Sequence, residues 1–335
     1  MPGWLTSREP ERTNVKLVGL IINILGKHDY NITYYEEIRK RKQYCFNIVA
    51  KKDDKLLLVK CLEKLKQFNA EIARELKAVS YTFSGVPLLV ALKNDNNRTL
   101  IENVVYKKHE IYSVSPNTLK SLLTNPQNVF IYAERGGYHV RIDGKKLRKL
   151  REEKRLSLGE VAELVGVTRK TIYEYERESI ESTPEIAIKL EEFFRDQLVK
   201  PINIFERYKE KGKEVALTYK RRKIDYPLFR GIYEKIKSYG LDIIPFKRTP
   251  FDMVIKGSRK PVIIKAIKRT KNEVEIREAQ YSARFARVTN AQLVVVSFKE
   301  ATLKKEERLT RLEEESNTIL LSPRELNEIK NIVES

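Results

Sequence analysis

The sequence LSLGEVAELVGVTRKTIYEYERE, residues 156–178, carries the start and stop signals of two short helices. Ser157 followed by Glu160 is a capping box, in which each side chain binds a free backbone amide, so a helix is expected directly after Ser157. Gly166 is expected to end this helix, because glycine tolerates the positive φ of a sharp exit. Thr168 is the N-cap of a second helix. The stretch therefore predicts two helices joined by a tight turn.

Apolar residues recur at helical spacing in the second helix, with Ile172 and Tyr175 on its inner face. The outer face is polar and begins with two cations. Its members are Arg169, Lys170, Tyr173 and Glu174. Arginine and lysine hydrogen-bond to guanine edges and phosphates, and helices of this kind enter the major groove of DNA. We therefore expect residues 168–178 to form a helix that reads double-stranded DNA.

Two further helices flank this pair. Residues 145–154 (KKLRKLREEK) form a helical run. Thr183 before Pro184 combines a cap with a proline at the first helical position, which opens a helix to about Gln197. The four helices together resemble a Cro/repressor-type (Xre-like) helix-turn-helix domain. A helical bundle that binds proteins instead of DNA is the alternative interpretation.

The resemblance implies roles for individual residues. It places Arg151 and Glu176 where such repressors form an internal ion pair. It places the start of the second helix where they touch bases and phosphates. The predicted DNA-binding residues are Ser157, Thr168, Arg169, Lys170, Tyr173 and Glu174.

The chain has 335 residues, of which 41% are apolar, and a formal net charge of +20. This length predicts two or three domains. Residues 1–140 hold 22 lysines and arginines against 14 acids, residues 201–335 hold 30 against 19, and residues 141–200 hold 14 against 13. Attraction to phosphates is therefore expected mainly from the flanking regions. RNA or acidic proteins could use the same charge, and a solvated surface without a partner would also carry it.

Other classes of site find little support. Two cysteines and three histidines form neither a CxxC pair nor an HxxxH spacing, so no zinc site, and no other metal or cofactor, is expected. No glycine-rich phosphate loop is present, so no small-molecule effector is identifiable. The longest apolar run, Leu17 to Leu25, is interrupted by Gly19 and Asn23 and is too short to span a membrane. It predicts a core helix in a cytoplasmic protein.

An internal repeat flanks the four helices. The segment FNIVAKKDDKLLLVKCL, residues 46–62, aligns without a gap on FDMVIKGSRKPVIIKAI, residues 251–267, with five identities. The offset of 205 persists from GVPLLV, residues 85–90, to NAQLVV, residues 290–295. Self-similarity at a fixed offset is the signature of a repeated structural unit. The two flanking regions are therefore predicted to be copies of one domain.

Each copy reads as a helix, a strand, a polar turn, a second apolar strand, a helix and a buried strand. This order predicts an α/β unit with a central sheet. It resembles the restriction-endonuclease-like fold, especially archaeal Holliday-junction resolvases, whose motif places an Asp on one strand and Glu-x-Lys on the next. The resemblance implies a divalent metal held by two carboxylates, with a lysine that stabilises developing charge.

The motif is incomplete in both copies. Asp252 occupies the first acid position in the C-terminal copy, but Asn47 occupies it in the N-terminal copy. The candidates for the second acid position are all neutral: Ile263 and Ala266 in the C-terminal copy, Leu58 and Cys61 in the N-terminal copy. Glu63 lies close by, but the pattern assigns it to a helix start. Apolar side chains cannot hold a hard cation, so we expect no catalytic residues and no enzyme.

Without its metal, such a domain is a basic scaffold that can grip phosphates regardless of sequence. The predicted phosphate contacts are Lys220, Arg221, Arg222, Lys223, Lys265, Lys268 and Arg269. A β-hairpin is expected over residues 131–142, with Arg135, Gly136 and Gly137 at its turn, and leads into the four helices.

The whole arrangement resembles the archaeal family of helix-turn-helix transcriptional regulators. The segments that carry the resemblance are LLLVKCLEKL (56–65), VVY (104–106), VSP (114–116), residues 136–167 and YERE (175–178). The implied fold is α/β and all-α: two restriction-endonuclease-like domains, residues 1–128 and 201–335, flank a hairpin and helix-turn-helix domain, residues 129–200.

The expected function is sequence-specific regulation of transcription by binding double-stranded DNA. A homodimer is expected, because one helix-turn-helix contacts only a few base pairs and two half-sites give useful specificity. Two alternatives remain open. One is a metal-dependent, structure-selective DNA nuclease, which would need an acid from outside the motif. The other is a nonspecific nucleic-acid-binding adaptor that acts through the flanking copies.

Overall fold

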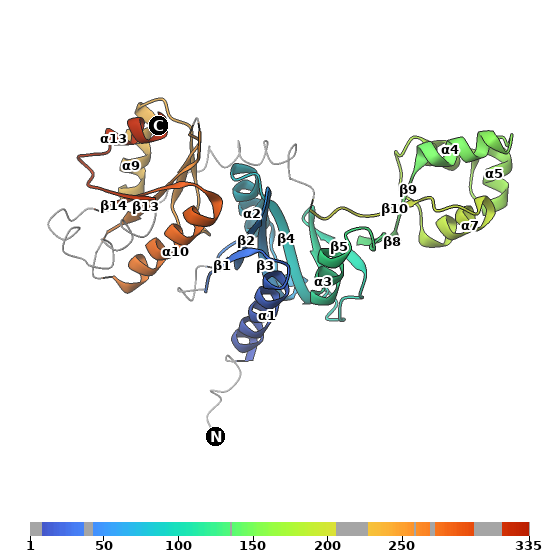
Figure 1. Cartoon of the computed structure of the whole chain (residues 1–335), viewed down its shortest axis with the longest axis horizontal. Coiled ribbons are helices and arrows are strands. Elements are labelled where there is room, and N and C mark those ends of the chain that lie inside the picture. Colours follow the sequence, from blue (N-terminus) through green and yellow to red (C-terminus); the bar gives the residue numbers. More distant parts are fainter. Residues whose placement is uncertain are drawn as a thin grey trace, which may run out of the picture. The chain divides into compact units, whose positions relative to one another are not determined.

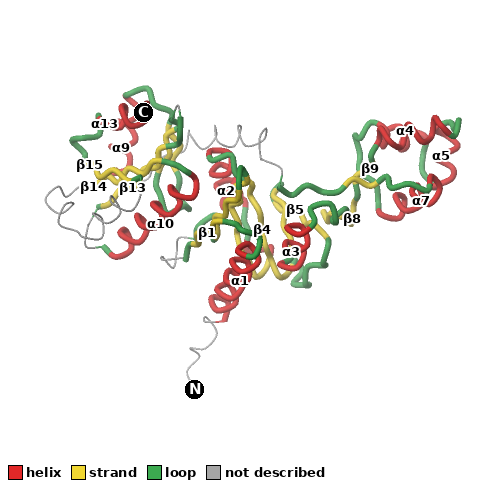
Figure 2. The backbone as a smooth tube through the Cα atoms, in the orientation of Figure 1, coloured by secondary structure: helices red, strands yellow, loops and turns green. Residues whose placement is uncertain are grey.

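The computed structural model describes residues 9–36, 43–134, 136–205, 227–257, 259–268, 272–297 and 317–334. The chain divides into two compact units. The first combines Met1–Leu89 with Phe205–Ser335, and the second is Val90–Ile204. Figure 1 and Figure 2 show their helices and strands.

Helix α1 (Glu9–Gly26) contains the longest apolar run of the sequence. Leu17, Ile21 and Leu25 on one face are buried, whereas Val15 and Leu20 are exposed. The run therefore forms a core helix, as its length and interruptions predict. No helix in the described ranges combines the length and the hydropathy needed to cross a bilayer.

The larger sheet has eight strands in the order β1-β2-β3-β4-β6-β5-β7-β8. Their bounds are β1 Asn31–Tyr34, β2 Ile48–Lys52, β3 Lys55–Lys64, β4 Val86–Lys93, β5 Val104–Lys108, β6 Ile111–Val114, β7 Ile131–Glu134 and β8 Gly137–His139. The connecting helices are η1 Leu65–Gln67, α2 Ala70–Thr82 and α3 Pro116–Thr124. Because β3 runs to Lys64, Glu63 lies in a strand, and its assignment to a helix start is wrong.

The smaller sheet has five strands in sequence order, β11 to β15. Their bounds are β11 Ile243–Pro245, β12 Met253–Ile255, β13 Val262–Ile267, β14 Gln292–Ser297 and β15 Thr318–Leu321, and the helices are α9 Pro227–Ser238, α10 Glu273–Thr289 and α13 Glu328–Glu334. One apolar core joins α9, α13 and the sheet. Every residue of β13 and β14 is buried, as in strands that are covered on both faces.

The two sheets contain antiparallel strand pairs with corresponding registers. Ile48 of β2 lies opposite Val59 of β3, and Met253 of β12 lies opposite Ile264 of β13. Met253 follows Ile48, and Ile264 follows Val59, by the same 205 residues that separate the aligned segments. The shared offset indicates that the aligned segments form the same antiparallel strand pair in each sheet.

Aromatic side chains pack the two sheets of the first unit together through α10. The rings of Phe46 and Phe251 both contact Phe285 of α10, with centroid separations of 5.5 Å and 4.9 Å. Tyr35 packs edge-on against Tyr281 of the same helix at 5.3 Å. All five residues are buried. Burial of these large rings stabilises the junction.

A buried carboxylate adds a polar contact at the same junction. Glu75 of α2 is fully buried and accepts hydrogen bonds from the backbone amides of Lys247, at 2.5 Å, and Arg248. The Arg248 guanidinium also pairs with Glu71, at 2.7 Å. The junction thus provides donors for a charge that would be costly to bury alone.

The second unit ends in four short helices with a small two-stranded sheet. Their bounds are β9 Arg141–Ile142, α4 Gly144–Glu153, α5 Leu158–Val165, α6 Arg169–Glu176, α7 Pro184–Phe194 and β10 Val199–Lys200. Helix α7 ends before the expected Gln197, because Arg195 adopts a left-handed conformation with φ of 54°. Helix α6 is shorter than the expected 168–178. The hairpin before the helices is formed by β7 and β8.

Candidate DNA-binding site

The local caps predicted from the sequence set the geometry of α5 and α6. Ser157 Oγ accepts the Glu160 amide at 3.2 Å, and the Glu160 carboxylate accepts the Ser157 amide at 2.7 Å. These hydrogen bonds lower the pKa of Glu160. Gly166 leaves α5 with φ of 80°, and Thr168 Oγ1 caps α6 by accepting the Thr171 amide at 3.1 Å. The turn between the two helices is confirmed.

An ion pair holds α6 against α4. Arg151 donates to both carboxylate oxygens of Glu176, at 2.6 Å and 3.1 Å, and to the Leu156 carbonyl at 3.0 Å. The two side chains are only 13% and 8% exposed. Hydrogen bonding to Glu176 raises the pKa of Arg151. The ion pair implied by the repressor resemblance is therefore confirmed, and its two parallel bonds orient α6.

Substituting Glu176→Gln should destabilise the four helices by about 2–4 kcal/mol, because Arg151 keeps its charge in a largely buried position and loses the carboxylate that accepts two of its hydrogen bonds. Hydrogen–deuterium exchange of α6 amides in the full chain would measure the loss. Glu153→Gln is the matched control, since Glu153 is an exposed residue of α4 that pairs with Lys149. Equal protection of α6 in both variants would show that the pair does not hold the helix.

Gly144 lets the backbones of α4 and α6 approach closely. A Cβ at this position would overlap the Tyr175 carbonyl oxygen and lie 2.5 Å from that of Glu176. Both are backbone atoms, so they cannot move away as a flexible side chain would. Gly144 is the first residue of α4, and its packing role becomes visible only in three dimensions.

Gly144→Ala should therefore destabilise the four helices by about 3 kcal/mol or more, at the upper end of overpacking effects. Chemical unfolding of the full chain, followed by exchange at α4 and α6, would measure it. Gly159→Ala is the matched control, because the nearest atom to its added Cβ is 3.7 Å away, and it should leave stability unchanged or raise it. A native-like Gly144→Ala variant would contradict the close approach.

The outer face of α6 presents the predicted cations to solvent. Thr168, Arg169 and Lys170 are exposed at its N-terminus. Tyr173 is 45% exposed one turn later. Arg177, which the sequence reasoning missed, stacks over the Tyr173 ring with its guanidinium 5.5 Å from the centroid. The spacing of four residues between an aromatic and an arginine was the signal that could have identified it.

Two other predicted residues have partners within the chain. Glu174 is half-buried, and its carboxylate accepts a hydrogen bond from the Ser179 hydroxyl. Ser157 is exposed, but its oxygen caps α5. Arg169 and Lys170 therefore have greater freedom to contact DNA than Glu174.

The predicted phosphate contacts of the flanking regions have different outcomes. Lys265 is 2% exposed and cannot reach a phosphate, so this prediction is wrong. Lys268 is exposed, with its ammonium 5.4 Å from the centroid of the Phe229 ring. Residues 220–223 and Arg269 lie outside the described residues.

Lys265 instead joins two carboxylates in the interior. Its ammonium lies 2.7 Å from Glu278 of α10 and 3.3 Å from Asp252, and Tyr44 donates to Glu278 at 3.4 Å. Burial disfavours the charged ammonium, but the two carboxylates outweigh burial and raise the pKa of Lys265. The lysine thus supplies the positive charge that two adjacent buried carboxylates require.

The first acid position has a structural role in both sheets. Asp252 Oδ2 accepts the Ala266 amide at 2.8 Å, and Asn47 Oδ1 accepts the Cys61 amide at 3.1 Å. A carboxylate and an amide oxygen serve this bond equally well, which explains why an asparagine suffices. Within the described ranges, no three His, Cys, Asp or Glu side chains converge as metal ligands.

Helix caps, a buried orienting ion pair and an exposed cationic helix face define a helix-turn-helix protein, here joined to α/β sheets. Comparison with known families agrees with this class. Residues 147–195 match the helix-turn-helix family, and residues 14–129 match the PD-(D/E)XK superfamily domain, the restriction-endonuclease-like class. Both domain types predicted from the sequence are therefore present.

Similar proteins occur in archaea and bear the name "Putative HTH-type transcriptional regulatory protein". That of Pyrococcus abyssi is 34% identical, over 74% of this chain and 77% of its own length. That of Pyrococcus horikoshii is 34% identical over 86% of both chains. One from Methanococcus maripaludis is 31% identical, over 75% of this chain and 79% of its own length. The chain belongs to this archaeal family of helix-turn-helix-type regulatory proteins. No solved structure matches it.

Proposed function

We propose that the chain is a sequence-specific regulator of transcription that reads the major groove of double-stranded DNA with α6. The observation that carries the proposal is the exposed start of α6, Arg169 and Lys170, on a helix that a buried ion pair orients. The guanidinium of arginine and the ammonium of lysine can both donate hydrogen bonds to the acceptor atoms of guanine and so distinguish it from other bases. Tyr173 and Arg177 extend the same face toward the DNA backbone.

The proposal includes a homodimer and an electrostatic contribution from the flanking regions. The helix-turn-helix region is close to neutral, whereas residues 201–335 hold 30 lysines and arginines against 19 acids. Nonspecific attraction to phosphates would thus come from outside the reading helix and fall with rising salt. Two copies would bind half-sites about one helical turn apart. The proposed regulator is not an enzyme.

We also propose that residues 1–128 and 201–335 are copies of one restriction-endonuclease-like domain on either side of residues 129–200. The equal offset of the strand register supports this, and so do the equivalent bonds of Asn47 and Asp252. In this proposal the copies are a basic scaffold for DNA and for the reading domain.

The test is a selection of genomic DNA fragments bound by the purified full chain at about physiological salt, with an Arg169→Ala/Lys170→Ala variant in parallel. An enriched palindrome that the variant fails to select is the expected result. Fragments without a shared motif, recovered equally by both proteins, would contradict sequence reading and favour a nonspecific binder.

A metal-dependent nuclease is the second candidate function. The observation that favours it is the position of the Glu278 carboxylate, close to the carboxylate of Asp252. Glu278 brings a carboxylate from outside the strand motif to the same lysine as Asp252. Cleavage of branched DNA in Mg²⁺ or Mn²⁺ that is lost on Asp252→Asn would support this candidate. Intact DNA under those conditions would leave regulation as the proposal.

A further inference from the structure

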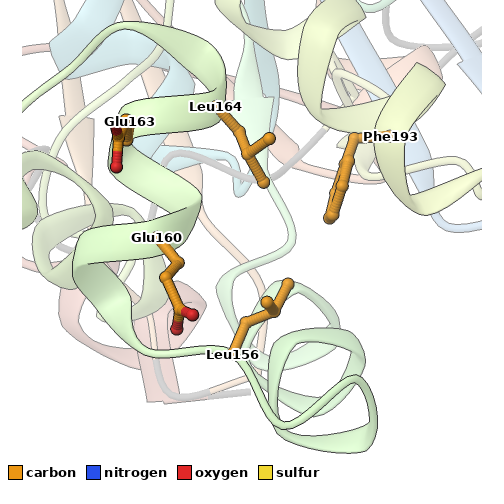
Figure 3. A pocket seen from close by; sticks show the side chains of 5 residues that line it. All are labelled: Leu156, Glu160, Glu163, Leu164 and Phe193. Carbon is orange, nitrogen blue, oxygen red and sulfur yellow. The ribbon is translucent and has the colours of Figure 1, made fainter.

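A depression of about 490 Å³ lies on the helix-turn-helix domain between α5, α7 and the loop before α5 (Figure 3). The side chains that line it are Leu156, Glu160, Glu163, Leu164 and Phe193. Leu164 is 50% exposed, while Leu156 and Phe193 are half-buried. Because Leu164 in its lining is half exposed, the depression is open to solvent. An open depression suits a protruding side chain of another protein better than a small ligand, which binds in enclosed pockets.

The lining is unsuitable for DNA. Glu160 and Glu163 are exposed carboxylates on α5 and would repel phosphates. The cations that suit DNA, Arg169 and Lys170, belong to α6, which does not line the depression. Exposed apolar side chains on two adjacent helices, Leu164 on α5 and Ile188 on α7, instead indicate contact with protein.

The charges around the depression are self-complementary. Its basic edge is Lys154, whose ammonium lies 5.6 Å from the centroid of the Phe193 ring. Its acidic edge is Glu160 and Glu163 on α5, across the depression from Phe193 (Figure 3). A twofold axis through the depression would place the acidic edge of one copy against the basic edge of the other. Such a patch can pair with itself, which is what a symmetric dimer requires.

We propose that two copies of the chain pair through this depression, with Leu164 of each copy inserted between Leu156 and Phe193 of the other. The inference rests on the proposed dimeric regulator and names the contact that forms the dimer. The aromatic residues between the two sheets are already packed against each other within one chain, so they are not available to a second copy.

The first test is the oligomeric state of the full chain by sedimentation velocity over a range of concentrations. Wild type should form dimers, and Leu164→Lys should raise the dimer dissociation constant by about ten-fold or more, because it places an ammonium in both apolar contacts. Ile101→Lys is the matched control, since Ile101 is also 50% exposed but lies outside the four helices. Equal dissociation constants in wild type and Leu164→Lys would overturn the proposal.

A charge exchange tests the symmetry of the contact. Glu163→Lys alone and Lys154→Glu alone should each weaken the dimer, because each sets like charges against one another twice. A mixture of the two variants should dimerise again, because position 163 of each copy then faces the opposite charge at position 154 of the other. If the mixture dimerises no more tightly than either variant alone, the proposed charged edges are wrong. If the wild-type chain is monomeric at all concentrations, the depression does not bind a second copy and the proposal is overturned.

DNA binding separates failure of this inference from failure of the proposed function. Leu164→Lys should still bind a DNA duplex with one half-site through α6, but should lose the additional affinity for two half-sites. Arg169→Ala/Lys170→Ala should dimerise normally and lose specific binding. A dimer unaffected by Leu164→Lys would sink the proposed contact alone, whereas specific binding unaffected by the α6 variant would sink the proposed reader.

Discussion

Lys265→Ala should destabilise the first unit by about 3–5 kcal/mol, the range observed when one partner of a buried ion pair is removed. The substitution leaves the carboxylates of Glu278, 1% exposed, and Asp252, 13% exposed, without the ammonium that lies between them. Exchange protection of β13 amides in the full chain would measure the loss for that sheet alone. Lys268→Ala is the matched control, because it removes an exposed lysine from the same segment.

Neutralising the second partner should recover part of this loss. In Lys265→Ala/Glu278→Gln the more deeply buried of the two carboxylates is replaced by an uncharged amide.

The pKa of Lys265 is raised in the folded chain. The lysine's contribution to the free energy of unfolding is therefore fully present below the unfolded pKa, about 10.4, and is lost only as the pH rises through the folded value. The contribution of the Lys265 charge should therefore stay constant through roughly the neutral pH range. A Lys265→Ala variant as stable as Lys268→Ala would contradict the buried triad.

Arg169→Ala/Lys170→Ala should weaken specific DNA binding by about 2–6 kcal/mol if each side chain makes one base contact worth about 1–3 kcal/mol. Both residues are exposed on α6 and the caps of that helix do not involve their side chains, so the domain should stay folded. Titration of the selected palindrome at several salt concentrations would measure affinity and salt dependence together. Binding to unrelated DNA should fall much less.

The matched control removes the same charge from another helix. Lys145→Ala/Lys149→Ala takes two exposed lysines from α4 and changes the net charge equally. If α6 reads bases, the control should retain preference for the palindrome while the α6 variant loses it. Equal losses of affinity in the two variants, with specificity unchanged, would show that these cations act only through general attraction to phosphates.

Much of the helix-turn-helix could be predicted from local patterns. The capping box at Ser157, the left-handed Gly166 and the Thr168 cap each act within a few residues, so their effects are readable in sequence order. The early end of α7 was missed because Arg195, a residue with no special turn preference, adopts the left-handed conformation. The role of Arg177 was missed because it arises from a stacked side-chain pair.

The flanking regions show where such reasoning fails. Lys265 and Lys268 look alike in a basic segment, yet one is buried and the other is exposed. The apolar run around Lys265 could have indicated a strand buried on both faces, but a buried lysine there is predictable only with its counter-charges. Glu278 is supplied by a helix later in the chain, and its approach to Lys265 depends on how α10 packs between the two sheets.

The amino-acid order alone therefore established the capped starts of α5, α6 and α7, the end of α5 at Gly166 and the cationic start of α6, because caps and glycine act over a few neighbouring residues. The tertiary structure decided which lysine lies in the interior, how closely α4 and α6 approach at Gly144 and where an open apolar depression remains. Those outcomes depend on desolvation and on contacts between distant segments, and the cost or gain of burying a charge exists only once the chain has packed around it.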